Sequence, residues 1–279
     1  MSESVNSGWK EYELREVGVV VTGKTPSSKN PDDFGNDIPF VTPTDYSNYH
    51  KEVSFADRLL SSIGANKLRS KILPPKSVMV TCIGSDMGKV AINTIPLITN
   101  QQINSIISDI KVVDPNFLYY KLVESYDVLR SYGLAGTAVP IVNKTDFEGI
   151  EILLPPLPEQ RAIAGVLSSL DDKIDLLRRQ NKTLEGMAEA LFRKWFIEEA
   201  DDSWQSGRLE DYLITELGGT PSTSKPEYWN GDIPWINSGE VNNFRIFQAT
   251  KYITELGLKE SNTKLLPKGT TVIAITGAT

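Results

Sequence analysis

Residue types that could carry out covalent or metal chemistry are few in this sequence. His50, in NYHKE, is the one histidine, and Cys82, in VMVTCIG, is the one cysteine. A zinc site or a histidine-activated nucleophile needs more of these groups, so the sequence supports neither. We expect His50 to be a solvated loop residue and Cys82 to be a small buried hydrophobe.

Glycine patterns that bind phosphates or nucleotide cofactors are missing as well. The sequence has no GxxxxGK(S/T) loop, and IGSDMGK lacks the strand–GxGxxG–helix context, so we interpret it as a turn at a strand end. The cofactor loop and the Asn-Pro-Pro-aromatic motif of methyltransferases are also absent. The sequence therefore predicts a non-catalytic protein with no cofactor and no metal of its own.

The composition is that of a globular protein of about two domains. Hydrophobic residues make up 40% of the 279 residues and charged residues 23%, which is enough apolar material for a core. No apolar run approaches the ~18 residues that a membrane helix needs. The N-terminus, MSESVNSGWKEYELREV, is too polar and acidic for a signal peptide. Together with the single cysteine, this predicts a cytoplasmic protein without membrane contact.

The chain repeats part of itself. A shift of 195 positions aligns these identities without a gap: Trp9 with Trp204, Leu14 with Leu209, Gly23 with Gly218, Thr25-Pro26-Ser27 with Thr220-Pro221-Ser222, Pro31 with Pro226, and Asp37-Ile38-Pro39 with Asp232-Ile233-Pro234. A two-residue shift then aligns Gly64, Leu73 and Gly84 with Gly257, Leu266 and Gly277. We infer one unit from about residue 9 to 202 and the opening of a second from about 203.

The first unit starts with an α+β domain that ends near Pro155. VGVVVTG, IPFVT and SVMVTCIGS are expected to be strands, each followed by a polar loop rich in turn-forming residues. Asp114 can cap a helix that starts at Pro115 and stops at Gly133. EGIEILLPPL is expected to be a final strand. The loops after the strands could present hydrogen-bonding side chains to a partner.

A long helix is expected to follow, because residues 159–196 contain no proline and carry apolar residues at alternating spacings of four and three. These positions form a heptad seam: Ile163, Leu167, Leu170, Ile174, Leu177, Asn181, Leu184, Ala188, Leu191 and Trp195. The polar member, Asn181, is of the kind that sets register and partner geometry. The helix could pack on its own domain, but a seam of about 55 Å, at 1.5 Å per residue, favours pairing with a second helix.

These features together resemble the specificity subunit of type I restriction-modification systems. The resemblance is carried by the repeated opening with TPSS and DIPFV, and by LPPLPEQR at residues 154–161, which leads into a helix containing Ile174-Asp175. In that family two target-recognition domains, joined by two long antiparallel helices, each read half of a bipartite DNA site. Methyltransferase subunits, which bind S-adenosylmethionine themselves, dock on the specificity subunit, and a separate restriction and motor subunit cuts DNA.

The resemblance implies three regions in this chain: a target-recognition domain at residues 1–155, a spacer helix at 156–200 and part of a second recognition domain at 201–279. The chain departs from the family pattern because it has one helix and an incomplete second domain. Either two copies pair as a symmetric homodimer, or another chain supplies the missing part, or the chain is an inactive truncation. We expect residues 203–279 to be poorly stable unless paired, since their apolar strands lack partners.

By the same resemblance, double-stranded DNA would be read by polar residues in the loops that follow predicted strands. Gln and Asn can bind adenine bidentately, and Lys can bind guanine or phosphate. The candidates are Lys24, Ser27, Ser28, Thr42, Thr44, Asp45, Tyr46, Ser85, Lys89, Gln101, Gln102, Thr137, Asn143 and Lys144. The outward face of the helix and the LPPLPEQR segment are the expected methyltransferase docking surfaces. A net charge of −7 implies weak DNA binding by the chain alone, so partner subunits would supply phosphate contacts.

Two other interpretations stay open. A coiled-coil assembly protein would show the same seam and would dimerise without sequence-dependent retention of DNA. A recognition domain that was once fused to an enzyme would also show the same α+β domain. That second alternative predicts methyltransferase motifs, which are missing from the sequence.

Overall fold

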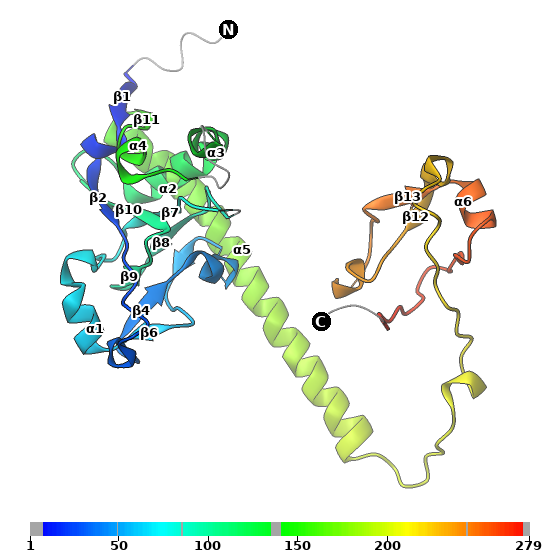
Figure 1. Cartoon of the computed structure of the whole chain (residues 1–279). Helices are drawn as coiled ribbons and strands as arrows, with labels where there is room; N and C mark the ends of the chain where they lie inside the picture. The colour runs from blue at the N-terminus through cyan, green and yellow to red at the C-terminus, as the bar shows by residue number, and fades with distance from the viewer. Residues whose placement is uncertain (1–7, 49, 85, 135–140, 244, 276–279) are drawn as a thin grey trace. The chain divides into compact units, whose positions relative to one another are not determined.

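The computed structural model describes residues 8–48, 50–84, 86–134, 141–243 and 245–275 (Figure 1). The chain has the expected α+β fold and forms two compact units, residues 1–194 and 195–279, which are described separately. The first unit contains a five-stranded sheet, a four-stranded sheet, a two-stranded sheet and a long helix, α5. All of the candidate residues for DNA contact belong to this unit.

The five-stranded sheet has the strand order β2-β10-β7-β8-β5. β10, Ile103–Ser108, pairs antiparallel with β2, Gly18–Thr22, on one side and with β7, Val78–Thr81, on the other. β8, Val90–Asn93, is antiparallel to β7 and parallel to β5, Glu52–Val53. Valine and isoleucine dominate these segments, and β7 and β8 are buried on both faces. β10 joins β2 to the rest of the sheet.

The four-stranded sheet has the order β3-β6-β4-β9 and consists of short strands. β4, Ile38–Val41, pairs antiparallel with β6, Leu59–Leu60, and parallel with β9, Ile98–Thr99. β3, Phe34–Gly35, pairs with the same strand β6. The parallel pairing places the polar turn after β4 next to the polar turn after β9.

Helices and a small ladder surround the sheets. The predicted helix at 114–133 is split at Ser125 into α2, Pro115–Glu124, and α3, Tyr126–Leu134. Asp114 caps α2 as predicted, since its Oδ1 accepts hydrogen bonds from the next two non-proline N–H groups at 3.0 and 3.2 Å. The remaining elements of the unit are β1 (Lys10–Glu13) paired with β11 (Glu151–Leu154), α1 (Ser62–Lys67), α4 (Lys144–Glu148), and the 3-10 turns η1 (Leu14–Glu16), η2 (Pro31–Asp33), η3 (Pro43–Asn48) and η4 (Arg69–Lys71).

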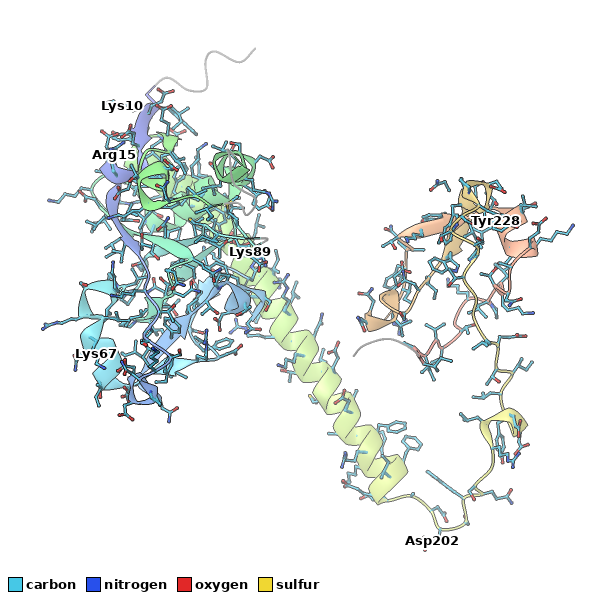
Figure 2. All side chains as sticks on the ribbon, in the orientation of Figure 1. Lys10, Arg15, Lys67, Lys89, Asp202 and Tyr228 are labelled. Carbon is cyan, nitrogen blue, oxygen red and sulfur yellow. The ribbon has the colours of Figure 1, made fainter. Side chains whose placement is uncertain are left out.

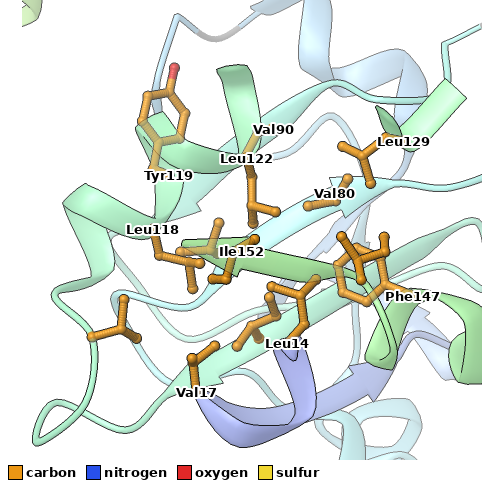
Figure 3. Close-up of a cluster of buried hydrophobic side chains, with 14 of the residues drawn as sticks. Leu14, Val17, Val80, Val90, Leu118, Tyr119, Leu122, Leu129, Phe147 and Ile152 are labelled. Atoms are coloured by element: carbon orange, nitrogen blue, oxygen red, sulfur yellow. The ribbon is translucent and has the colours of Figure 1, made fainter. Parts of the chain in front are cut away.

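The main hydrophobic core lies between the five-stranded sheet and α2. Figure 3 shows Leu118 and Leu122 of α2 packed with Val80 of β7, Ile152 of β11 and Phe147 of α4. All five side chains are buried. Burial of one such side chain stabilises the fold by ~1.5–3 kcal/mol, so this core is a firm support for the loops at the ends of the strands.

Cys82 belongs to the same core, as predicted, and its behaviour toward pH can be tested. Burial raises the pKa of the Cys82 thiol to about 12, although Asn104 opposes the shift by hydrogen bonding. Because the folded protein holds this proton more tightly than the unfolded chain, the thiol stabilises the fold fully below pH ~9 and loses that contribution as pH rises toward 12. We expect no reaction of native protein with Ellman's reagent at pH 8 and one equivalent in urea. Rapid reaction without urea would contradict this assignment.

Helix α5, Leu157–Arg193, contains 37 residues, and a π-helical turn, η5 (Lys194–Glu198), follows it. Gln160 and Ala164 are buried, and Ile163 packs on the main core. From residue 176 onward every side chain of the helix is exposed, and Figure 1 shows this half extending away from the sheets of the unit. The first turns of the helix therefore pack on the domain, and the seam residues from 176 to 193 are exposed, so pairing with a second helix stays a prediction.

His50 does not lie in solvent, contrary to the prediction. Its side chain is 28% exposed, and its Nδ1 lies 3.9 Å from Asp171 Oδ1 and 3.7 Å from Asp175 Oδ1, both on α5. The local sequence NYHKE is polar and gives no sign of this contact. The loop before β5 is covered by a helix that follows more than 100 residues later in the chain.

The second unit reproduces the opening of the first. β12, Trp229–Trp235, pairs antiparallel with β13, Lys251–Ile253, and α6, Glu255–Lys259, follows. The ladder pairs Trp229–Ile253 and Ile233–Ile253 are equivalent to Phe34–Leu60 and Ile38–Leu60. The N-caps are equivalent too: Thr254 and Ser61 each accept a hydrogen bond of 3.1 Å from the glycine N–H three residues on. The further turns of this unit are η6 (Leu209–Asp211), η7 (Pro226–Tyr228) and η8 (Glu240–Asn242).

A carboxylate at the equivalent position holds the same turn in each of the two units. Asp45 accepts hydrogen bonds from the backbone N–H groups of Thr42 at 2.7 Å and Asp57 at 3.1 Å. Glu240 accepts equivalent bonds from Asn237 at 2.9 Å and from Thr250 at 2.7 Å. The bond from Thr250 lowers the pKa of Glu240. We call this arrangement the carboxylate clasp.

Two segments of the second unit, residues 213–217 and 271–275, are equivalent to β2 and β7 but do not form strands. In the first unit both strands pair with β10. Leu217, Ile273 and Ile275 are exposed, Ile273 at 76%. The β propensity of these segments is therefore not enough for them to form strands, and a central partner strand is needed as well.

Candidate nucleic-acid interface at one end of the five-stranded sheet

Loops that are far apart in sequence meet at one end of the five-stranded sheet. The register pairs Thr22 with Asn104, Thr81 with Ile103, and Val80 with Val90. β2 and β7 therefore end where β8 and β10 begin. The loops at this end are residues 23–30, 82–89 and 100–102, and we call them the sheet-end loops. They contain Lys24, Ser27, Ser28, Lys89, Gln101 and Gln102 of the predicted DNA-binding set.

The first and third of these loops cross each other in close contact. The Lys24 N–H donates to Thr99 O at 2.9 Å, and the Gly23 N–H donates to Ile103 O at 3.1 Å. Thr25 Oγ1 donates to Gln101 Oε1 at 2.5 Å, which orients the exposed amide of Gln101. A Cβ at Gly23 would overlap the carbonyl oxygens of Thr99 and Asn100. The crossing thus requires glycine at this position.

A second set of bonds fixes the turn before β10. Asn100 Nδ2 donates to Gln102 Oε1 at 2.8 Å, and the Gln102 N–H donates to Asn100 Oδ1 at 3.1 Å. Asn100 is itself anchored, because its N–H donates to Val41 O at the end of β4. The prediction omitted Thr25 and Asn100, which hold Gln101 and Gln102 in place. Both could have been found from the sequence. Thr25 lies in the Thr-Pro turn and Asn100 in the TNQQIN run, and each is next to residues of the predicted set.

Several polar side chains on these loops are exposed. Lys24, Ser27 and Ser28 are exposed. Lys89, labelled in Figure 2, follows the β7–β8 turn. Its Nζ lies 2.6 Å from Asp86 Oδ1 in an exposed ion pair. An exposed pair of this kind is worth ~0–1 kcal/mol, so a DNA phosphate could replace Asp86 at small cost. These groups can donate hydrogen bonds to base edges or phosphates.

Three predicted residues are turned inward, which corrects their assignment as base-contacting side chains. Thr42, Asp45 and Tyr46 are buried. Asp45 forms the carboxylate clasp and also accepts a bond from Thr42 Oγ1 at 2.7 Å. Thr44 is exposed on the same turn, with its Oγ1 2.9 Å from Thr42 Oγ1. The pattern Thr-x-x-Asp was a sequence signal for a capping role of Asp45.

Asn143 and Lys144 have local roles in α4. Asn143 caps this helix by accepting from the Asp146 N–H at 3.0 Å, and Lys144 pairs with Glu148 at 3.3 Å. Both remain exposed. The residue before them, Val142, donates its N–H to Cys82 O at 2.9 Å, so α4 starts next to the second sheet-end loop. Ser85 and Thr137 lie outside the described residues.

The described part of the chain holds no candidate metal centre. No three His, Cys, Asp or Glu side chains there are grouped as ligands for a metal ion. In the same residues, no helix combines the length and the hydropathy needed to cross a membrane. The sheet-end loops thus concentrate outward-facing polar groups that the strand topology brings together from distant parts of the sequence.

Comparison with known proteins agrees with the resemblance seen in the sequence. The family described as type I restriction modification DNA specificity domain matches residues 6–186 and again residues 201–279. The specificity subunit of the type I restriction enzyme MjaIX from Methanocaldococcus jannaschii is 30% identical over 277 residues, covering 92% of this chain and 63% of that subunit. The HindI specificity subunit from Haemophilus influenzae is 37% identical over 153 residues, covering 54% of this chain and 33% of that subunit. This chain therefore spans less than two thirds of the length of either relative.

A solved structure shows a similar fold. The crystal structure of the type I restriction-modification system S subunit from M. genitalium aligns with 91% of this chain and 64% of that chain, with a TM-score of 0.54 at 16% identity. The double family match agrees with the structural repeat of β3, β6 and β4 in β12 and β13. On the strength of the family match over both units, the chain belongs to the type I restriction modification DNA specificity domain family.

Proposed function

We propose that this chain reads one half of a bipartite DNA site and directs adenine methylation and cleavage by partner subunits. The observation that supports this best is the convergence of three sheet-end loops, with Lys24, Lys89 and Gln101, on a domain from which a long open helix starts. A non-catalytic reader needs this kind of rigid platform with exposed donors. Base contacts by these loops would give specificity, and partner subunits would add phosphate contacts to an acidic chain.

The proposed organisation follows from the same reasoning. Residues 1–155 act as a recognition domain, residues 156–200 as a spacer and residues 201–279 as part of a second recognition domain. At 1.5 Å per residue, α5 is about 55 Å long, which suits two half-sites about one turn of DNA, ~34 Å, apart. The partners are methyltransferase subunits, which carry S-adenosylmethionine, a restriction and motor subunit, and a second helix supplied by another copy or another specificity chain.

Mapping of methylated adenine tests this proposal. The chain is co-expressed with its methyltransferase subunit in a host without background methylation, and methyladenine is located by long-read sequencing. A split palindromic motif is expected if two copies pair, because two-fold symmetry of the protein imposes an inverted repeat on the DNA. A split asymmetric motif would mean that another chain supplies the second half. Absence of methylation would count against a reading function and for an inactive chain.

The open seam also favours a second candidate, a coiled-coil assembly protein that does not read DNA. Leu170, Leu177 and Leu184 are exposed within this chain, as such a protein would require. The two candidates differ in one property that can be measured. Retention of a fragment with the methylated motif over a scrambled fragment supports the reader, and equal retention supports the assembly protein.

A further inference from the structure

A buried polar cluster ties α5 to the recognition domain about three to four turns from the helix start. Lys51, in the loop before β5, is only 4% exposed. Its Nζ donates to Ser168 Oγ on α5 at 2.8 Å and to the Tyr120 hydroxyl on α2 at 3.3 Å. The Tyr120 hydroxyl donates in turn to Asp171 Oδ2 at 2.5 Å. Three elements are thus joined by hydrogen bonds, and we call this cluster the second clamp.

The rings of α2 complete the second clamp. Lys51 Nζ lies 4.9 Å from the ring centroid of Tyr120 and 5.6 Å from that of Tyr119, within reach of a cation–π attraction. Burial raises the pKa of Tyr119 to about 12, and the negative charges of Asp171 and Asp175 add to this. Burial and the bond to Asp171 raise the pKa of Tyr120 as well. Tyr120 therefore remains a protonated donor to Asp171 at neutral pH.

A first clamp lies in the opening turn of α5. Gln160 is 1% exposed. Its Nε2 donates to Pro155 O at 2.8 Å and to Val112 O at 3.1 Å, while its Oε1 accepts from the Asp114 N–H at 2.9 Å. All three partners are backbone groups of the domain. The start of the helix is thus fixed by bonds to main-chain atoms, and these bonds do not depend on the side chains of the partner residues.

The first and second clamps together define the direction of α5, because each fixes one point along its axis. Gln160 is 8 residues before Ser168 and 11 before Asp171, so the clamps are ~12–17 Å apart along the axis. The helix then continues to Arg193 with exposed side chains. Its far end is ~50 Å from Gln160. A tilt of about 5° about the first clamp would move that end by ~4 Å, which is more than the ~3.4 Å between neighbouring base pairs.

Stability alone gives little reason for a lysine at this place. Buried ionic groups can often be replaced by apolar residues of similar volume without loss of stability. An apolar contact between α5 and α2 would, however, allow the helices to slide and tilt, whereas hydrogen bonds from Lys51 and Tyr120 are satisfied in one arrangement. The cluster is therefore suited to fixing an angle.

We propose that Lys51, Tyr120 and Asp171 are positioning residues that set the direction of α5, and through it the number of base pairs between the two half-sites. This inference rests on the proposed function, because it assigns a determinant of spacing to the same reader. None of these residues lies on the sheet-end loops, so they act on spacing and not on base identity.

The test uses Lys51→Met, which keeps the apolar stem, and Tyr120→Phe, which removes one oxygen atom. Lys121→Met is the matched control, since the ammonium group of Lys121 pairs with the exposed Glu124 of the same helix. Each variant of the full chain is co-expressed with the methyltransferase subunit and a plasmid library in which the distance between the half-sites varies base pair by base pair. Methylation at each distance is then read by long-read sequencing.

Wild type and Lys121→Met are expected to favour one distance. Lys51→Met and Tyr120→Phe are expected to accept neighbouring distances with at least tenfold less discrimination, while the bases within each half-site stay the same. If both variants keep the preference of wild type, the inference is overturned. A uniform loss of methylation at all distances, with unchanged preference, would show a merely structural role and would also overturn it.

A spectroscopic distance measurement separates this inference from the proposed function. Spin labels on the exposed positions Arg69→Cys and Glu189→Cys report the direction of α5 by double electron–electron resonance, and the buried Cys82 stays unlabelled. One narrow distance is expected with the wild-type clamp, and a broader distribution with Lys51→Met or Tyr120→Phe. If wild type methylates no DNA but the distribution still broadens, the proposed function fails and the clamp stands. An equally narrow distribution in the variants would refute the clamp.

Discussion

Gly23→Ala is expected to lower the free energy of unfolding of the first unit by about 3 kcal/mol, the upper end of the usual cost of overpacking. The new Cβ would overlap the backbone oxygens of Thr99 and Asn100, which cannot move aside without breaking the crossing of two sheet-end loops. Gln101 would lose its bond from Thr25. We therefore also expect loss of methylation at the half-site that we propose this domain to read. Urea unfolding and methylation mapping measure the two effects.

The chain supplies its own controls for this substitution. Gly218 is the equivalent residue of the second unit, and no atom lies within 4 Å of the position that an added Cβ would take, so Gly218→Ala is expected to be nearly neutral. Gly165, on α5, has the same open space, and Gly165→Ala is expected to stabilise by up to ~1 kcal/mol through helix propensity. An unfolding midpoint of Gly23→Ala equal to that of Gly218→Ala would rule out the steric argument.

Leu177→Lys combined with Leu184→Lys is expected to abolish pairing of α5 with a second copy. At roughly 2 kcal/mol for each leucine lost from a dry interface, two substitutions in each of two helices weaken association by roughly 8 kcal/mol, or about 10⁵-fold to 10⁶-fold. The fold of each chain should persist, since both leucines are exposed within it, Leu184 at 62%. Sedimentation velocity measures the change from dimer to monomer.

Thr183→Lys with Ala190→Lys is the matched control for the seam. It adds the same charge to exposed positions of α5 that lie outside the heptad seam. This variant should associate as wild type does. If the seam variant remains a dimer, or if wild type is a monomer at micromolar concentration, self-pairing through the seam is wrong. The alternatives are then a second helix from another specificity chain or an inactive chain.

Much of the fold could be predicted because its signals are local or repeated. The heptad spacing from Ile163 to Leu191 is a local property, and the structure has one continuous helix there. Asp114 with Pro115 marked the start of α2. The repeat was visible as identity between TPS and DIP segments, and the ladders of β4 and β12 reproduce it. Sequence order also predicted which loops follow strands, although not that they share one end of a sheet.

The features that were missed depend on contacts between distant residues. Lys51 is charged and stands in a polar run, yet it is buried because Ser168, 117 residues later, accepts its hydrogen bond. His50 is half-covered by the same helix. Asp45 was predicted to contact DNA because its side chain is polar and follows a strand, whereas its partner Asp57 belongs to the next segment. Hydropathy and periodicity describe neighbours along the chain and carry no information on such pairs.

The carboxylate clasp has a consequence for how this scaffold can evolve. Its hydrogen bonds run from main-chain N–H groups, which nearly every residue type can provide, to Asp45 or Glu240. The outward residue of the turn is Thr44 in one unit and Gly239 in the other, and the turn persists with either. The shape of the turn and the chemistry of its outer surface are thus determined by different residues. New sequence preferences can accumulate on the outside of such turns by single substitutions, while selection on folding acts on the inward carboxylate alone.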